Sequence, residues 1–418
     1  MPQDNLPLDT LASAKGQAAT SEAALPQYDI DNAELTRLGK KPVLKRNFGL
    51  VSMLAFACTV MITWEGVLLL FSISFTNGGF AGSVYEYIMV WLGTMATFAT
   101  MGELASMAPT AGGQYHWTSM LAPKFCRKFL SYFIGWLTMI GPSMSEEISN
   151  PAVNVPRAMV FSLVLNGTLG LAMLIATLFC LGDADTVLGT ATGYPFMEIF
   201  RQAVENVPGA LTMSALISIL NMCATISFVA TASRMTWAFA RDRGTPGWRF
   251  LSKIEPRTTL PLMSIMFTII VAVLLSFIGL GSPVAFNSVV SLSINGLYTS
   301  YLIGNALLLY RRVTGAIKAY DPYDRSLANV DCDSLTWGPW KIPEPFGTIV
   351  NGFGCAYLVV ILIFSFWPIG INPTPKDMNY SSLMCGAVAI FSLLYYFVRG
   401  KKTYKGPVVE IDGAEPSK

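Results

Sequence analysis

The sequence predicts an all-α protein that crosses a membrane several times. Of its 418 residues, 53% are hydrophobic and 13% are charged, whereas soluble domains average about 25% charged residues. The apolar residues gather in runs of about 20, the length that a helix needs to cross a hydrocarbon core of about 30 Å. Because lipid cannot hydrogen-bond to a backbone, such runs predict helices.

Composition also narrows the chemistry. The net charge of +2 is too small to indicate a nucleic-acid partner. The seven cysteines show no metal-ligand spacing, and His116 is the single histidine. We therefore predict no cofactor and no metal site. No nucleophile, base or metal constellation indicates an enzyme.

The chain divides into four parts by composition. Residues 1–46 are rich in small and polar residues and predict a disordered tail. Residues 47–144 hold spans at 49–76 and 85–108 and a marginal apolar run at 129–144. Residues 145–398 hold six further spans, and 399–418 form a second tail. These six spans lie at about 158–181, 209–240, 261–281, 284–310, 348–367 and 381–398.

The first span contains the strongest candidate binding site. Glu65 is the one charged residue between Gly49 and Thr76, and a carboxylate at membrane depth usually faces a cavity or a partner. The segment from Met61 to Gly66 is poor helix material, so we expect a local break there. Broken helices with polar groups near the midplane form the substrate sites of secondary transporters. The alternative is that Glu65 only pairs with another helix. The candidate residues of this segment are Thr59, Thr63, Trp64, Glu65 and Gly66.

Loop charges predict an orientation and expose a conflict. Lysines and arginines concentrate in 241–260, in 311–347 and in 399–405, so these segments and both tails are expected in the cytoplasm. Counting spans back from there also places 145–157 inside. Counting forward from the first tail places 145–157 outside if 129–144 crosses. Either 129–144 does not cross, or the chain has lost an odd number of spans near Gly141.

Three separated motifs carry a resemblance to a known family. GELASMAPTAGGQYHW (102–117), MSEEISNPAVNVPRAM (144–159) and SRMTWAFARDRGTPGW (233–248) resemble segments of permeases in the amino acid, polyamine and organocation superfamily. The similarity is greatest to the fungal branch of amino acid, GABA and choline permeases. It covers nearly everything from about 45 to 405.

The resemblance implies twelve spans, of which the first ten form two inverted five-helix repeats. Aligned by its motifs, this chain has spans one, two, part of three, and seven to twelve. It is expected to lack about three to four helices of the first repeat and the sixth span, between about 138 and 145. The family's pocket is shared between breaks in spans one and six, so half of it is missing.

The resemblance also implies a function. We expect a proton-coupled permease in the plasma membrane for amino acids or amines such as GABA or choline. The competing hypothesis is a truncated or mis-spliced chain that does not transport and has a binding or regulatory role, or none.

Further candidates lie outside the first span. Polar residues in the span at 209–240 either line the pocket or bond between helices: Asn221, Thr225 and Ser227. Glu103 and His116 belong to the first motif, where gating or loop structure competes with a proton relay.

Overall fold

The computed structural model describes residues 37–38, 49–138, 148–190, 192–255, 257, 260–281, 283–321, 326–367, 379–404 and 406–407. Within these ranges the fold is helical, and its only strand-like pairing is an isolated bridge between Lys318 and Thr336. The helices are α3 (Leu50–Met61), α4 (Thr63–Met107), α5 (Gly113–Leu121), α6 (Arg127–Leu137), α7 (Pro151–Phe179), α8 (Ala184–Leu188), α9 (Pro195–Val204), α10 (Val207–Arg241), α11 (Trp248–Leu251), α12 (Leu262–Gly281), α13 (Pro283–Val313), α14 (Phe346–Ser365), α15 (Ser381–Tyr395), the π-helical turn η2 (Tyr396–Gly400) and α16 (Lys401–Thr403).

Six helical segments of the described chain are long and apolar enough to cross a membrane. They confirm an all-α, multi-pass membrane protein. One of them, Leu50–Met107, joins the first two predicted spans. The other five each correspond to one predicted span: Pro151–Phe179, Val207–Arg241, Leu262–Gly281, Phe346–Ser365 and Ser381–Thr403. Helix α13 covers the predicted span at 284–310 but is not among the six.

Helix α4 is two helices joined by a sharp turn at Gly79. Gly79 has φ 61° and ψ −157°, a backbone region that is essentially restricted to glycine. Ser74 donates a hydrogen bond to Glu86 over 3.2 Å, although twelve residues of straight helix would separate them by about 18 Å. The two arms therefore fold back on each other, as the predicted turn between the first two spans requires.

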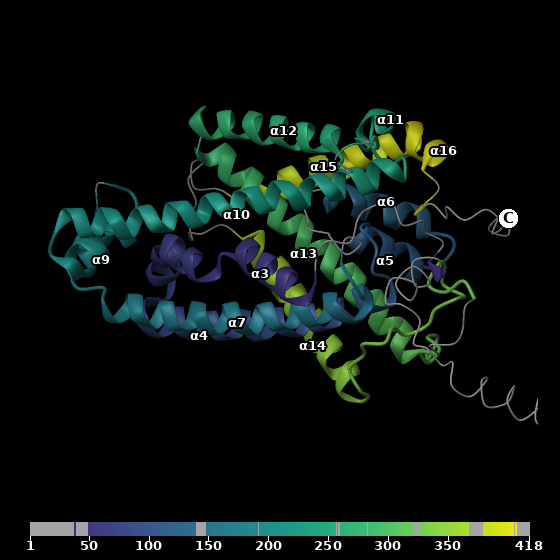
Figure 1. Cartoon of the computed structure of the whole chain (residues 1–418), viewed down its shortest axis with the longest axis horizontal. Coiled ribbons are helices and arrows are strands. Elements are labelled where there is room, and N and C mark those ends of the chain that lie inside the picture. The colour runs from purple at the N-terminus through teal and green to yellow at the C-terminus, as the bar shows by residue number, and fades with distance from the viewer. Residues whose placement is uncertain are drawn as a thin grey trace, which may run out of the picture.

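The second arm of α4 packs closely against α7 and α14. Trp91 Nε1 donates to the Leu163 carbonyl over 3.0 Å, and the Tyr87 hydroxyl donates to the Gly167 carbonyl over 3.1 Å. A Cβ at Gly167 would lie 1.9 Å from Trp91 Nε1, so only glycine permits this approach. In Figure 1, α4 and α7 run together along the long axis of the molecule, with α3 and α10 beside them.

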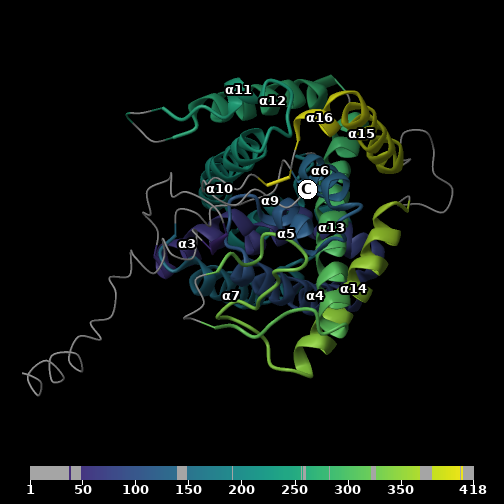
Figure 2. The same ribbon diagram turned by 90° about the vertical axis from the view of Figure 1, so that its right-hand side faces the viewer.

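One end of the bundle holds α5, α6, α11, α16 and the segments 314–321 and 326–345, and we call it the loop end (Figure 1). Figure 2 views this end and shows these segments crossing in front of α5 and α7. A buried cluster fills it, and Leu38 joins this cluster from the N-terminal part, with 5% of its surface exposed. The remainder of the predicted tail, except Arg37, lies outside the described residues.

The segment around α6 bears on the conflict between the two span counts. Helix α6 has 11 residues, about 16 Å of helix, which is too short to cross. The chain is described again from Ile148, which is fully buried in the loop-end cluster with Leu104. The described part of the marginal run therefore does not cross, and α7 starts at the end where the second arm of α4 finishes. Residues 139–147 lie outside the described residues.

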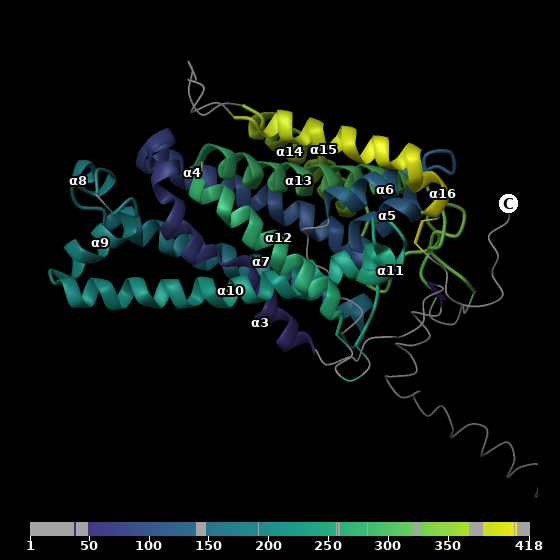
Figure 3. The same cartoon turned by 90° about the horizontal axis from the view of Figure 1, so that it is seen from above.

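Helices α10 and α12 leave much of their apolar surface exposed. Ser264 is the one buried residue among the 20 of α12, and α10 exposes Leu211, Leu216 and Met222. Figure 3 shows α10 along one edge of the molecule and α12 crossing the face toward the viewer.

Candidate functional site

The predicted break in the first span lies at Ile62. Helix α3 ends at Met61 and α4 begins at Thr63, and between them Ile62 takes the left-handed conformation with φ 36° and ψ 43°. This conformation costs an L-residue about 1–2 kcal/mol, and a β-branched side chain is rarely found in it. The sequence therefore bends where β-branched residues and a glycine weaken the helix.

Glu65 lies one turn beyond the break and is buried, with 7% of its surface exposed. Its Oε2 atom has no hydrogen-bond partner among the described residues. Trp64 packs beside Leu68 in a cluster with Phe196 of α9 and Ile217 of α10. Among the described residues, no basic side chain forms an ion pair with this carboxylate.

The other predicted residues of this segment form local contacts. Thr59 donates to the Ala55 carbonyl over 2.9 Å, and Thr63 donates to the Met61 carbonyl over 3.5 Å. A Cβ added to Gly66 would meet no atom within 4 Å, so open space adjoins its Cα.

A cavity of about 210 Å³ lies beside the break. Met61 forms part of its wall, and further walls come from α4, α5, α7, α10 and α13. No charged residue lines the cavity within the described chain. Four aromatic side chains line it: Phe56, Phe98, Trp117 and Tyr301. None of the ten residues predicted from the sequence is part of its wall.

Gln114 is one of the polar residues that line the cavity. It comes from the GGQ of the first motif, 5% of its surface is exposed, and its Oε1 atom has no hydrogen-bond partner among the described residues. Ser162 and Thr231 also line the cavity, but their hydroxyls bond to carbonyls of their own helices. The cavity therefore combines an aromatic wall with one free amide oxygen.

Asn166 of α7 adjoins the break and was not singled out by sequence reasoning. Its Nδ2 atom donates to the Ser162 carbonyl over 2.9 Å and lies 3.7 Å from Met61 Sδ. Its sequence context, Asn-Gly-Thr, is a glycosylation pattern, but it lies inside a membrane-span candidate.

The predicted residues of α10 bond within their own helix. The side chains of Asn221, Thr225 and Ser227 each donate to the carbonyl four residues earlier, over 2.9, 2.9 and 3.2 Å. Thr225 is exposed and the other two are half-buried. The α10 residue that reaches the cavity is Thr231, one turn after Ser227.

Glu103 forms a buried ion pair at the loop end. Its carboxylate contacts the Arg312 guanidinium of α13, with 0% and 3% of these side chains exposed. Its Oε1 atom also accepts from the Ile342 backbone N–H over 2.9 Å. Arg312 pairs in addition with Glu344 over 2.9 Å. Burial alone would raise the pKa of Glu344, but hydrogen bonds from Thr348 and the charge of Arg312 outweigh it and the pKa is lowered.

His116 is buried in α5 next to two residues with opposite surroundings. Trp117 faces the cavity, whereas the Tyr115 hydroxyl donates to Asp242 Oδ2 over 2.8 Å. Burial, followed by the negative charge of Asp242, raises the pKa of Tyr115 well above its ordinary value. Tyr115 therefore ties α5 to the end of α10.

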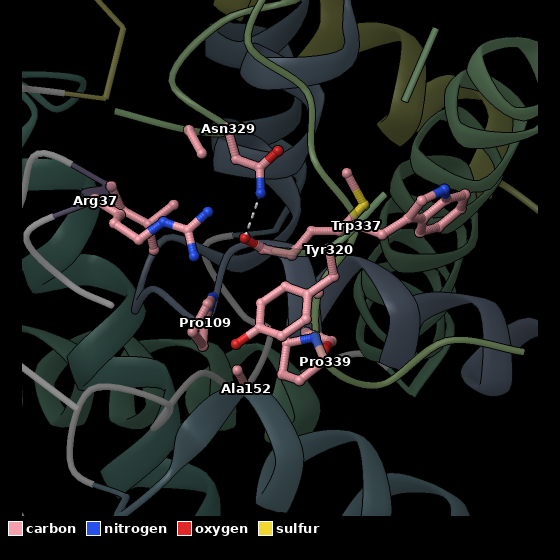
Figure 4. A pocket seen from close by; sticks show the side chains of 12 residues that line it. Arg37, Pro109, Ala152, Tyr320, Asn329, Trp337 and Pro339 are labelled. Atoms are coloured by element: carbon pink, nitrogen blue, oxygen red, sulfur yellow. Dashed lines mark hydrogen bonds between the residues drawn. The ribbon is translucent and has the colours of Figure 1, made fainter. Parts of the chain in front are cut away.

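A second pocket at the loop end measures about 30 Å³. Figure 4 shows the Arg37 guanidinium pointing into it across from the Tyr320 ring, and the Asn329 amide donating to the Met107 carbonyl, over 2.8 Å. One water needs at least about 10–15 Å³. This pocket can hold a water or two, but not a metabolite.

Comparison with known proteins identifies the family. Residues 138–390, more than half of the chain, match the family model described as amino acid permease. The chain belongs to the amino acid permease family. It is therefore a transporter and not an enzyme.

Individual relatives are distant in sequence but extensive in coverage. A protein of Macrophomina phaseolina named as an amino acid/polyamine transporter is 23% identical, over 79% of this chain and 97% of its own length. An uncharacterized amino-acid permease of Schizosaccharomyces pombe is 22% identical, over 92% of this chain and 90% of its own. The choline transporter of Saccharomyces cerevisiae is 27% identical, over 62% of this permease and 43% of its own length.

The first two alignments are longer than the part of this permease that they contain. For the Macrophomina relative, 79% of 418 residues is about 330, whereas the alignment has 455 positions. About 125 positions therefore carry no residue of this chain. For the Schizosaccharomyces relative, 92% is about 385 of 511 positions, and the difference is again about 125.

Proposed function

We propose that this permease carries a small amine or amino acid, such as choline or GABA, and that a proton gradient drives the transport. The cavity beside Ile62 is the part of the substrate path that the chain retains. The observation that carries this proposal is an uncharged aromatic cavity with a free amide oxygen, next to a broken first span.

The chemistry of the cavity favours an ammonium group. Its aromatic faces attract a desolvated cation by up to about 2 kcal/mol each. The Gln114 oxygen accepts a hydrogen bond, and an acceptor left alone in a buried site is costly until a donor meets it. Glu65 lies four positions after the cavity's Met61, at the start of the next helix. The names of the relatives, which include amino acid, polyamine and choline transport, agree with such a substrate.

The loop end is the cytoplasmic end in this proposal, and the membrane is the plasma membrane. The basic segments at 124–128, 241–257 and 311–341 all meet at this end (Figure 1), as the positive-inside bias requires. Both tails then lie in the cytoplasm.

The internal deletion expected from the motifs is also part of the proposal. The missing segment comprises the rest of the third span and spans four to six, so the two inverted repeats are incomplete. Three observations support this: the family match begins at 138, about 125 alignment positions carry no residue of the chain, and α12 is almost entirely exposed. A run of about 125 residues is long enough for three to four spans with their loops.

Ligand binding and uptake test the proposal together. The purified chain, reconstituted in phosphatidylcholine, should bind radiolabelled choline or GABA, and Gln114→Leu should weaken GABA binding roughly tenfold or more through loss of a hydrogen bond to its ammonium group. Gln202→Leu is the matched control, because Gln202 bonds to Glu198 on α9 and lies far from the cavity. Equal affinities for the two variants would contradict the assignment of the cavity.

Uptake should be measured for the 418-residue chain and for a longer transcript product, if one has added codons between Thr138 and Glu147. Proton-driven uptake by either form supports the permease function. If the 418-residue chain binds the substrate but does not take it up, the alternative of a non-transporting chain is supported.

A further inference from the structure

A basic pocket lies where α13 ends and α14 begins, away from the cavity beside Ile62. It measures about 240 Å³, and three of its lining residues are basic: Arg311, Arg312 and Lys341. Glu344 is the one acidic residue in its wall. With Glu103, which reaches Arg312 from below, these groups carry one net positive charge.

The basic groups are held in place before any ligand binds. Arg311 Nε donates to the Leu121 carbonyl over 2.9 Å, and Arg312 is fixed by its two carboxylates. The Trp337 ring lies 4.8 Å from the Arg312 guanidinium and 4.5 Å from the Lys341 ammonium. The backbone of Trp337 is fixed by its own N–H, which donates to the Lys318 carbonyl over 3.0 Å.

Arg312 supplies the second observation that points to an anion. Its side chain is 3% exposed and lines the pocket, yet its Nε–H has no hydrogen-bond partner in the described chain. A buried donor on a charged group costs free energy until an acceptor meets it. Lys341 has three ammonium hydrogens, and its ammonium group lies over the Trp337 ring.

Apolar side chains beside the pocket place it at the membrane boundary. Phe346 is the first residue of a membrane-span candidate, and it is 66% exposed. Val313 and Ile349 are 70% and 61% exposed and stand two positions before the lining residue Gly315 and one after Thr348. A ligand in the pocket would thus have its charged group among basic side chains and an apolar part along α14.

We propose that this pocket binds the phosphodiester headgroup of an anionic phospholipid, with the acyl chains lying along Phe346 and Ile349. One negative charge balances the net positive charge of the site. Basic pockets between spans on the cytoplasmic side are known to favour anionic headgroups. Free phosphate shares the headgroup chemistry, but it would leave the exposed apolar rim unused.

The test uses the full chain in detergent, titrated with phosphatidylinositol or phosphatidylcholine and followed by native mass spectrometry. Phosphatidylinositol should bind more tightly than phosphatidylcholine. Lys341→Gln should weaken phosphatidylinositol about fivefold, the factor that corresponds to about 1 kcal/mol per basic residue near an anionic surface. Lys253→Gln, which removes an exposed lysine of the loop end outside the pocket, should leave the affinity unchanged.

Two further arms separate a lipid from free phosphate. Phe346→Ser should weaken phosphatidylinositol, and inorganic phosphate at the same concentration as the lipid should not displace it. Displacement by phosphate, with Phe346→Ser unchanged, would show a free-anion site and overturn the lipid assignment. Equal binding of both lipids, or equal loss in the two lysine variants, would overturn the site itself. Lys341 and Phe346 are exposed, so both variants should retain the unfolding midpoint of the parent chain in phosphatidylcholine.

Discussion

Replacing Glu103 with glutamine should lower the free energy of unfolding by about 3 kcal/mol. Breaking a buried ion pair by removing one partner costs about 3–5 kcal/mol, because the other charge stays buried. Glu103 and Arg312 are 0% and 3% exposed, so the range for a buried pair applies. Two contacts survive: Arg312 keeps Glu344, and the new amide oxygen can still accept from Ile342. The loss is therefore at the lower end of the range.

Reversible unfolding in mixed micelles with increasing dodecyl sulfate, followed by tryptophan fluorescence, measures this difference. Glu344→Gln is the matched control, because Glu344 contacts the same guanidinium but its side chain is 39% exposed. An ion pair with an exposed partner contributes about 0–1 kcal/mol. The double variant Glu103→Gln with Arg312→Met should be more stable than Arg312→Met alone, since the carboxylate left unpaired is then Glu344, which is 39% exposed, and not the buried Glu103. Equal costs for Glu103→Gln and Glu344→Gln would refute the reasoning that burial decides the strength of this network.

The same unfolding assay checks three further substitutions. Gly347→Ala should cost about 1–3 kcal/mol, because its Cβ would lie 1.9 Å from Arg312 Nη1. The control Gly352→Ala on the same helix meets nothing within 4 Å and should stabilise by up to about 1 kcal/mol. Equal effects of the two substitutions would refute the contact. Asn329→Ala should cost about 2–4 kcal/mol, since it loses three buried hydrogen bonds and must keep φ at 57°, and Asn329→Gly should cost less because glycine accepts that angle. Ile62→Gly should be about 1 kcal/mol more stable than Ile62→Ala, the reverse of the order in a regular helix, because φ is 36°; the usual order would refute the strain.

The spans were predictable from the sequence because each depends on one contiguous run of apolar residues. The break near Ile62 was predictable for the same reason, since β-branched residues and Gly66 act locally. The hairpin at Gly79 also followed from its own short segment. In each case the physical cause lies within a few residues of the feature.

The cavity could not be predicted in this way because its wall is assembled from distant segments. Gln114 and Tyr301 are separated by most of the described chain, and neither stands out by charge. The partner of Glu103 is 209 positions away, at Arg312. For Glu103 the sequence indicated gating or loop structure, with a proton relay as the alternative, and these roles stay predictions. A buried glutamine in a glycine-rich motif was the available signal for the cavity.

One hydrogen bond beside the cavity fixes the segment between α4 and α5. Pro109 and Thr110 of this segment line the cavity, and Trp117 Nε1 donates to the Ala108 carbonyl over 2.9 Å. Trp117→Phe removes this buried hydrogen bond and should ease opening, since such a bond contributes about 0.5–1.5 kcal/mol. A cysteine placed in the cavity wall by Met101→Cys should then react faster with a water-soluble thiol reagent applied at the loop end, after subtraction of labelling in the parent chain. An unchanged rate would mean that the Trp117 bond does not hold the cavity shut.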